Sequence, residues 1–368
     1  MRLPIAVDAM GGDHAPAAVV RGALKAVEEM EGLRVELVGS EPEILRELEA
    51  EAWGGDSITV VPASETVGMG ESPVEAVRSK KDSSVSVGLK RVRDGEACAF
   101  VSAGNTGASV AASSLLLRTL PEVRKAGIAV VLNVGIKPLI LMDVGANIEA
   151  RPEHLVQYGV MASLYASRIH SVEDPSVGLL NIGEENAKGN RLAKQTHDLF
   201  RVSDVSFRGN VEPGELFRGV CDVAVCDGFT GNIVLKLAEG LAERLFLMFK
   251  DGASQVVSEL ADARDADARD AGAGEPDSAV SRLVQAALAR LGDTIDYAKS
   301  GGAPLLGVNG TVIISHGRSG PKAISNAIRM ANKMAEVDIN SGIVQNLRAL
   351  SSEPEPDEEG GVAACSAD

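Results

Sequence analysis

Short turns rich in glycine, asparagine and aspartate recur along the chain, and most of them directly follow an apolar run. In the first, Asp8, Gly11 and Gly12 come at the end of the run 3–9. Glycine lets the backbone approach a ligand closely, and backbone N–H groups together with amide side chains can hold an oxyanion. Few hydroxyl nucleophiles accompany these turns. The pattern therefore indicates a site that binds an anion or steadies negative charge developing on oxygen.

The same residue types recur in later turns, which contain Asn105 and Thr106, residues 145–147, Lys188 and Asn190, Asp227 and Asn232, and Asn309. The ordinary alternative for any one of them is a plain tight turn, because Asn and Gly both tolerate left-handed backbone. Lys188 is suited to pair with a phosphate as a point charge, although it could equally be a solvated surface lysine. His316 follows the last apolar run, and a lone histidine is more often structural. Six such turns at strand ends favour a shared site.

The elements that must position these turns alternate between strands and helices. Apolar runs predict strands at 3–9, 33–38, 57–62, 97–102, 127–133, 138–144, 177–182, 205–210, 222–226 and 311–315. Apolar residues at 3.6-residue spacing predict helices at 16–30, 41–52, 73–93, 105–118, 152–170, 188–201, 230–250, 279–299 and 319–336. This alternation is typical of an α/β fold with a doubly wound, mostly parallel sheet. Ligands of such sheets bind beyond the carboxyl ends of the strands, where the turns fall.

Two parts of the chain depart from this rhythm. Only four residues separate the runs 127–133 and 138–144, which predicts an antiparallel hairpin within the sheet. The stretch 251–277 is polar, low in complexity and rich in helix breakers, so we expect an acidic flexible excursion there, either a loop or a frayed helix. We expect one α/β catalytic unit over 1–350 and a disordered acidic tail over 351–368.

Charge is concentrated in those two departures. The chain has a net charge of −16, yet residues 251–277 hold eight acidic residues against two arginines, and 353–368 hold six acidic residues and no basic one. The remainder is therefore only weakly acidic, and the acidity belongs mainly to solvated segments. Without a general basic excess the chain cannot displace counterions from a nucleic acid, so we expect no nucleic-acid partner.

Several standard chemistries lack their motifs. There is no Gly-x-Ser-x-Gly elbow and no Walker lysine motif. Histidine and cysteine do not occur at zinc spacing, so we predict no metal. The turn at Gly11 and Gly12 lacks the Gly-x-Gly-x-x-Gly fingerprint, which disfavours a dinucleotide, and we predict no cofactor.

Cysteine usage and hydropathy suggest the compartment. Cys98 and Cys226 sit inside apolar runs and are interpreted as small buried hydrophobes with free thiols. No apolar run reaches the roughly 18 residues needed to span a bilayer, and no basic-then-apolar leader precedes the first strand. We therefore expect a cytoplasmic protein, with weak association with a membrane left open.

A local basic stretch contrasts with the acidic segments. It contains Arg78, Lys80, Lys81, Lys90, Arg91 and Arg93, with Asp82 as the acid among them. Such a patch could dock an acidic partner. The alternative is a solvated helix face.

Taken together, ordered blocks of sequence resemble a known family. The blocks are VDAMGGDHAP at 7–16, SPVEA at 72–76, KKDSS at 80–84, VSAGNTG at 101–107, DVGAN at 143–147, GLLNIGEE at 178–185, KGN at 188–190, CDGFTGN at 226–232 and GGAPLLGVNG at 301–310. They are similar to the PlsX family, the bacterial phosphate acyltransferases of phospholipid synthesis. The resemblance runs from about residue 5 to 335 and is far more specific than any single glycine turn.

The resemblance implies a reaction and a set of partners. A long-chain acyl group would pass from acyl-[acyl carrier protein] to inorganic phosphate, and the acyl phosphate would be handed to a membrane glycerol-3-phosphate acyltransferase. It also implies a homodimer and a fold akin to isocitrate and isopropylmalate dehydrogenases. The basic stretch would then be a docking site for the acidic carrier protein. An acidic 251–277 departs from the more apolar excursion of the family, and anionic lipid would repel it.

The reaction suggests roles for the residues in the turns. We predict Lys188, Asn232, His316 and Asn309 as catalytic residues, and Asp8, Gly11, Gly12, Asn105, Thr106, Asn190 and Asp227 as substrate- or phosphate-binding residues. A thiolate leaves readily, so bound phosphate could attack the thioester directly without a covalent enzyme intermediate. Asn232, Asn309 or His316 would face the carbonyl oxygen as it gains charge.

Three other functions remain alternatives. A phosphate acetyltransferase acting on acetyl-CoA shares the chemistry, and an apolar tunnel would favour the long-chain substrate instead. An NAD-dependent decarboxylating dehydrogenase follows from the fold relationship alone and would need a carboxylate metal cluster. A non-catalytic regulator that binds a carrier protein would have no need of the glycine and asparagine turns.

Overall fold

The computed structural model describes residues 3–133, 137–267, 282–284, 286–288, 292 and 301–351. The strands are β1 (Ile5–Asp8), β2 (Val35–Gly39), β3 (Ile58–Pro62), β4 (Ala99–Ser102), β5 (Gly127–Leu132), β6 (Leu139–Met142), β7 (Val177–Leu180), β8 (Phe207–Val211), β9 (Val223–Val225), β10 (Ala303–Leu306) and β11 (Thr311–Ile314). The helices are α1 (Ala17–Glu29), α2 (Glu41–Ala50), α3 (Pro73–Ser79), α4 (Ser84–Arg93), α5 (Thr106–Leu116), α6 (Pro152–His170), α7 (Arg191–Arg201), the 3₁₀ helix η1 (Pro213–Arg218), α8 (Gly228–Asp267), α10 (Pro321–Val337) and α11 (Ile339–Ser351).

One sheet runs through the molecule, and its strand direction reverses in the middle. Across the described residues the order is β3-β2-β1-β4-β11-β10-β5-β6-β9-β7-β8. At one side of the sheet β3, β2, β1, β4 and β11 are parallel to one another. At the other side β6, β9, β7 and β8 are parallel to one another. Between these groups, β10 and β5 pair antiparallel with their neighbours. The carboxyl ends of the two groups therefore point to opposite edges of the sheet.

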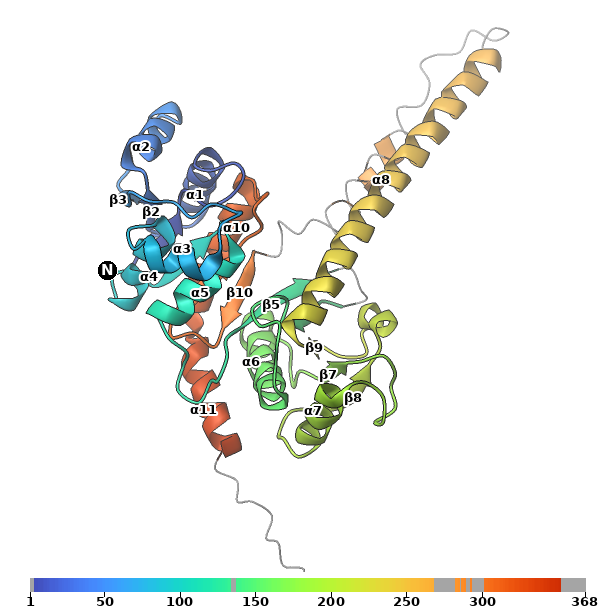
Figure 1. Cartoon of the computed structure of the whole chain (residues 1–368). Helices are drawn as coiled ribbons and strands as arrows, with labels where there is room; N and C mark the ends of the chain where they lie inside the picture. Colours follow the sequence, from blue (N-terminus) through green and yellow to red (C-terminus); the bar gives the residue numbers. More distant parts are fainter. Residues whose placement is uncertain are drawn as a thin grey trace, which may run out of the picture.

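Helices cover both faces of the sheet, because successive residues of a strand point to opposite sides. In β1, Ile5 and Val7 belong to one core cluster and Ala6 to the other. The first cluster lies under α1, α6, α7 and α10, and the second under α3, α4 and α5. Figure 1 shows the arrangement. Small and branched side chains fill both cores, as expected for a chain with few aromatic residues.

Helix α8 is the element that stands out. It begins at the carboxyl end of β9, passes over the sheet face and projects well beyond the rest of the molecule (Figure 1). Residues 251–267, the described part of the predicted loop or frayed helical excursion, form the last part of α8. Alanine, the strongest helix former, is frequent there and outweighs the charged residues. Residues 268–277 and 352–368 lie outside the described residues.

The predicted fold class is confirmed: this is an α/β fold with a mostly parallel sheet and the expected hairpin, β5–β6. One element prediction is wrong, and some elements were missed. The helix predicted at 73–93 is two helices, because the chain leaves the helix at Lys80 and the Ser83 hydroxyl caps α4. Strand β10 and helix α11 were not predicted. Of the predicted helix 279–299, only the helical residues 282–284, 286–288 and 292 are described.

A helix that crosses a bilayer must be both long and apolar. Among the helices in the described part of the chain, none is both long and apolar enough to cross a membrane.

Candidate active site

A cavity of about 820 Å³ lies between α8 and the start of α5, over the sheet face where β11, β10 and β5 meet. Its polar lining residues include Thr106, Asn133, Asn232, Lys236, Glu239, Glu243, Ser315, His316 and Arg318. The carboxyl end of β11 supplies His316, and one side of α8 supplies Asn232, Lys236 and Glu239. The cavity therefore collects polar groups from both halves of the sheet.

The floor of this cavity is apolar. Ile128, Val130, Val144 and Ile314 project from the sheet face, and Leu235 of α8 joins them. Ile128 and Ile314 are almost fully buried. An apolar floor beneath a polar rim suits a substrate with a charged part and a hydrocarbon part, and the volume lies within the range of small-molecule pockets.

Close packing at its first turn fixes the position of α8. A Cβ added to Gly231 would lie 1.9 Å from the backbone oxygen of Asp143, so only glycine lets the helix approach the loop after β6. The buried carboxylate of Asp143 accepts hydrogen bonds from the backbone N–H groups of Ile128, Gly145, Ala146 and Asn147 at 2.8–3.1 Å. This network makes the loop a rigid support for the helix that carries Asn232 and Lys236.

His316 is the centre of the polar rim. Its Nδ1 accepts a hydrogen bond from the backbone N–H of Arg318 at 3.2 Å, and its Nε2 lies 3.4 Å from Nζ of Lys236. Lys236 also donates to Glu239 at 2.9 Å, within the same helix. Burial lowers the pKa of His316, and the nearby cation of Lys236 lowers the pKa further. The ring is therefore neutral at pH 7, and the acceptor role of Nδ1 assigns the proton to Nε2.

A second group of turns supports this rim without lining the cavity. Asp8 is buried, and its carboxylate accepts from Ser102 Oγ at 2.7 Å and from the N–H of Met10. Burial raises the pKa of Asp8. At Gly12, with φ of 110°, a Cβ would lie 3.1 Å from the oxygen of Gly317, so the turn packs directly against the residue after His316. Asp8, Gly11 and Gly12 thus hold the turns in place, and a carboxylate at Asp8 would repel a phosphate.

Three predicted phosphate ligands are helix caps. Asn105 Oδ1 accepts from the N–H of Ala108 at 3.0 Å, and Asn190 Oδ1 accepts from that of Ala193 at 2.9 Å. Asp227 accepts from the N–H and the hydroxyl of Thr230 at the start of α8. Their side-chain oxygens satisfy helix N–H groups, which explains why Asn and Asp follow these strands. The amide nitrogen of Asn105 also donates hydrogen bonds, to the backbone oxygens of Gly68, Met69 and Glu71.

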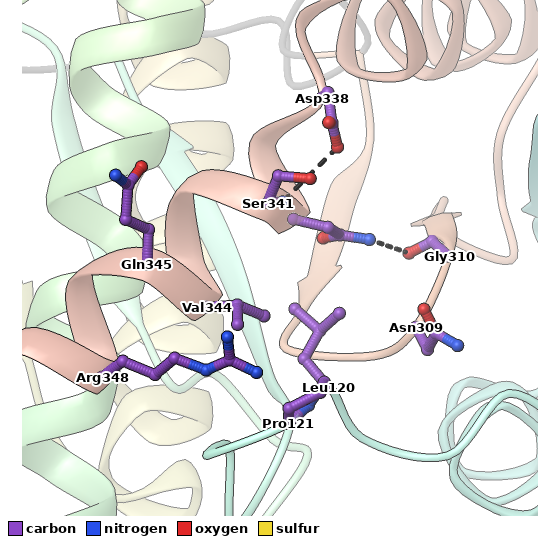
Figure 2. Close-up of a pocket in the computed structure, with 10 residues that line it drawn as sticks. Leu120, Pro121, Asn309, Gly310, Asp338, Ser341, Val344, Gln345 and Arg348 are labelled. Atoms are coloured by element: carbon purple, nitrogen blue, oxygen red, sulfur yellow. Dashed lines mark hydrogen bonds between the residues drawn. The ribbon is translucent and has the colours of Figure 1, made fainter. Parts of the chain in front are cut away.

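The structure separates two further predicted residues from His316. Asn309 precedes β11 whereas His316 follows it, so the strand lies between them. Asn309 lines a different, open pocket of about 670 Å³ against α11, shown in Figure 2, where Asn340 donates to the oxygens of Val308 and Gly310. Lys188 lies in the turn after β7, where its backbone oxygen accepts a hydrogen bond from the side-chain amide of Asn181. Among the described residues, neither Lys188 nor Asn309 lines the cavity.

Thus Thr106, Asn232 and His316 are the predicted residues that share the cavity. Sequence reasoning missed Lys236 and Arg318, which supply its cations. A signal existed for Lys236, because it follows Asn232 by four residues and both must lie on one side of a helix. In the described part of the chain, no group of three or more His, Cys, Asp or Glu side chains could hold a metal ion.

The predicted basic stretch is partly neutralised. Lys80 pairs with Glu71, Arg91 with Glu36 and Glu96, and Arg93 with Asp94. Lys90 donates to the backbone oxygen of Lys81. The surface left for an acidic partner is therefore smaller than the count of basic residues suggests. Pro73, at the start of α3, packs against Gly107 of α5, which lines the cavity.

The chain is similar to known proteins over nearly its whole length. The family model described as "Fatty acid synthesis protein" matches residues 3–341. A protein named phosphate acyltransferase from Desulforamulus reducens is 42% identical over 94% of this chain and 97% of its own length. Another of that name, from Desulfitobacterium hafniense, is 44% identical over 94% and 96%.

Solved structures show a similar fold at low sequence identity. A phosphotransacetylase from Streptococcus pyogenes matches with a TM-score of 0.57 at 17% identity over 95% of both chains. A branched-chain phosphotransacylase from Enterococcus faecalis matches with 0.54 at 14% over 90% of this chain and 99% of its own. At sequence identities this low, the two matches show a similar fold and nothing more about this chain. The family model and the full-length relatives show that the chain belongs to the phosphate acyltransferase family, a family of transferase enzymes.

Proposed function

We propose that the protein transfers a long-chain fatty acyl group from acyl-[acyl carrier protein] to inorganic phosphate, yielding acyl phosphate for phospholipid synthesis. A phosphate oxygen forms a bond to the thioester carbonyl carbon, the carbon–sulfur bond breaks, and the proton of hydrogen phosphate ends on the released thiol. No redox change and no covalent enzyme intermediate are needed.

One observation carries the proposal: a single cavity joins a polar, cation-bearing rim to an apolar floor. Phosphate needs charge and hydrogen-bond donors, whereas a fatty chain needs apolar surface. Each buried methylene contributes about 0.8 kcal/mol, so a floor formed by Val130, Ile314 and Leu235 favours a long chain over acetyl. The names of the relatives and their near-complete coverage support transfer to phosphate.

Within this cavity His316 and Asn232 are proposed to act on the thioester. The neutral imidazole presents its Nε2–H, and the Asn232 amide presents two further donors from the facing helix. Donors fixed before the reaction stabilise the oxyanion that forms as phosphate attacks. Holding phosphate and thioester side by side provides the remaining rate enhancement by positioning.

The carrier protein is proposed to dock beside the cavity. Among the described basic residues of the stretch, Arg78 and Lys81 are on the exposed surface near α3, which packs on α5. An acidic partner would steer toward them. Reversing the charge of both should raise the KM for the acyl carrier protein, whereas reversing Arg93 should have little effect because Asp94 already pairs with it.

A homodimer is proposed to form through α8. Its apolar stripe of Phe229, Ile233, Leu237, Leu241 and Leu245 is 42–67% exposed and lies on the side of the helix away from the cavity-lining residues. A continuous exposed apolar surface of this kind marks an interaction site. The projecting helix offers this stripe to a second copy by a two-fold contact.

The dimer has a direct test. Leu237→Glu together with Leu241→Glu should convert the protein to a monomer in analytical ultracentrifugation, because each change places a charge in the apolar contact. Glu243→Gln, on the cavity side of the same helix, should leave the sedimentation coefficient unchanged. A double variant that still sediments as the wild type would place the interface elsewhere.

We propose a cytoplasmic location, with hand-over of acyl phosphate to a membrane glycerol-3-phosphate acyltransferase. The product carries a fatty chain and a labile anhydride, so its consumer must accept it near a membrane. Flotation with vesicles of neutral and anionic lipid would measure any weak membrane association.

The decisive experiment mixes the protein with palmitoyl-[acyl carrier protein] and inorganic phosphate and detects acyl phosphate by ³¹P NMR or hydroxylamine trapping. The expected result is stoichiometric acyl phosphate and free carrier protein, with acetyl-CoA a far poorer donor. Turnover of acetyl-CoA alone would assign the protein to acetyl transfer instead, and no product from either donor would overturn the proposal.

A further inference from the structure

Resting on the proposed function, the geometry points to Lys236 of α8 as the residue that binds the attacking phosphate, paired across the cavity with His316. The sequence alone had offered Lys188 for this role. Lys236 belongs to none of the glycine turns and lies within a helix, two turns beyond its start.

A hydrogen bond fixes the orientation of the His316 imidazole. Because the N–H of Arg318 donates to Nδ1, the neutral ring carries its proton on Nε2. That nitrogen lies 3.4 Å from the ammonium of Lys236, so the two groups face the same part of the cavity. Phosphate held by the charge of Lys236 would lie beside the Nε2–H that is proposed to hold the carbonyl oxygen, in position to attack the thioester.

Charged groups of both signs surround Lys236 and His316. Lys236 and Arg318 line the cavity as cations, and Glu239, which pairs with Lys236, and Glu243 line it as acids. Asp13 faces His316 from the turn after β1, and a Cβ added to Gly317 would lie 3.6 Å from its carboxylate oxygen Oδ1. Glu239 and Asp13 raise the pKa of His316, and Lys236 and Arg318 lower it.

Lys236 is accessible from the solvent. The Lys236 side chain is 54% exposed, so a small dissolved ion can reach it without movement of the helix. The apolar floor begins on the same side of α8, at Leu235. Phosphate bound at Lys236 would therefore lie at the edge of the surface on which we propose the acyl chain rests, within reach of its carbonyl carbon.

The test uses binding of inorganic phosphate to the full-length protein in the absence of any acyl donor, by isothermal titration calorimetry. Lys236→Met should weaken phosphate binding by about tenfold to a hundredfold, the range for losing a charged hydrogen-bond donor. Lys236→Arg should retain most of the affinity, because the charge remains. In steady-state assays Lys236→Met should raise the KM for phosphate by a similar factor and leave the KM for the acyl carrier protein unchanged.

Lys250→Met is the matched control, since it removes a lysine from the same helix outside the cavity lining. It should bind phosphate like the wild type. Lys188→Met is the competing arm. If that variant loses phosphate affinity while Lys236→Met retains it, the inference is overturned. Absence of acyl transfer with intact phosphate binding would instead sink the proposed reaction and leave the phosphate site standing.

A spectroscopic readout separates contact from mere structural support. The pKa of His316 is followed by proton NMR of the ring, assigned with His316→Asn among the five histidines of the chain. Removing the cation in Lys236→Met should raise this pKa, although burial keeps it below the ordinary value. Phosphate should also raise it in the wild type, because a bound anion favours the protonated ring. A His316 resonance that ignores phosphate would contradict the pairing.

Discussion

His316→Ala is expected to lower kcat by about 10²- to 10³-fold, the usual loss when a fixed donor to a developing oxyanion is removed. The Nε2–H of the neutral ring is the proposed donor, and the hydrogen bond from the backbone N–H of Arg318 to Nδ1 holds the ring in that tautomer. Rates with palmitoyl-[acyl carrier protein] at saturating phosphate measure the effect. His316→Gln, which restores an N–H donor, should recover part of the loss.

The same residue predicts how the rate depends on pH. Because the pKa of His316 lies below its ordinary value, the ring stays neutral at pH 7 and gains its second proton only when the pH falls below that lowered pKa. Protonation puts a hydrogen on Nδ1 against the Arg318 N–H, so the wild-type rate should fall there. The ratio of wild-type to His316→Gln rates cancels the ionisation of phosphate itself. A ratio constant across the acid range would exclude His316 as the donor.

Gly231→Ala is expected to destabilise the protein by about 3 kcal/mol or more and to abolish activity. The added Cβ would sit 1.9 Å from the Asp143 backbone oxygen and 2.9 Å from Cys226 Sγ. Neither can yield easily, because Asp143 is held by hydrogen bonds and Cys226 is buried between strands. Helix α8 must therefore move, and Asn232 and Lys236 move with it. Urea unfolding and the acyl-transfer assay measure the two effects.

Gly240→Ala makes the same chemical change on the same helix. No atom lies within 4 Å of its Cβ position, so the variant should keep activity and gain up to about 1 kcal/mol from better helix propensity. If both variants behave alike, close packing at Gly231 is not what positions α8, and the account of how the site is assembled fails.

Much of the fold was accessible from sequence because most elements carry their own periodicity. The hairpin followed from two apolar runs four residues apart. Strand β10 escaped because its short run follows two glycines with positive φ, Gly301 and Gly302, and includes Pro304, residue types that normally indicate a turn. Helix α11 buries Ile339, Ile343 and Leu347 at four-residue spacing, a signal that was present and passed over.

The site was harder to predict, for a physical reason. Asparagine and aspartate after a strand serve two purposes that look alike in sequence, binding a ligand or capping the next helix, and here Asn105, Asn190 and Asp227 cap. Which strand ends meet also depends on strand direction. The antiparallel pairs in the middle of the sheet place the carboxyl ends of β7 and β9 at the edge opposite the one that carries His316. Lys188 stays in the turn after β7, whereas α8, which follows β9, carries Asn232 to the cavity.

Helix α8 has opposite sides with different tasks: Lys236 faces His316, and the next residue, Leu237, belongs to the outward stripe. A rigid rod cannot rotate one side without the other. If a second copy of the chain binds the outward stripe, as proposed, it also fixes the orientation of the Lys236 ammonium toward the cavity, so dimerisation and phosphate binding would be linked equilibria. Thermodynamic reciprocity then requires that occupancy of the cavity alter the strength of assembly by the same factor that assembly alters occupancy.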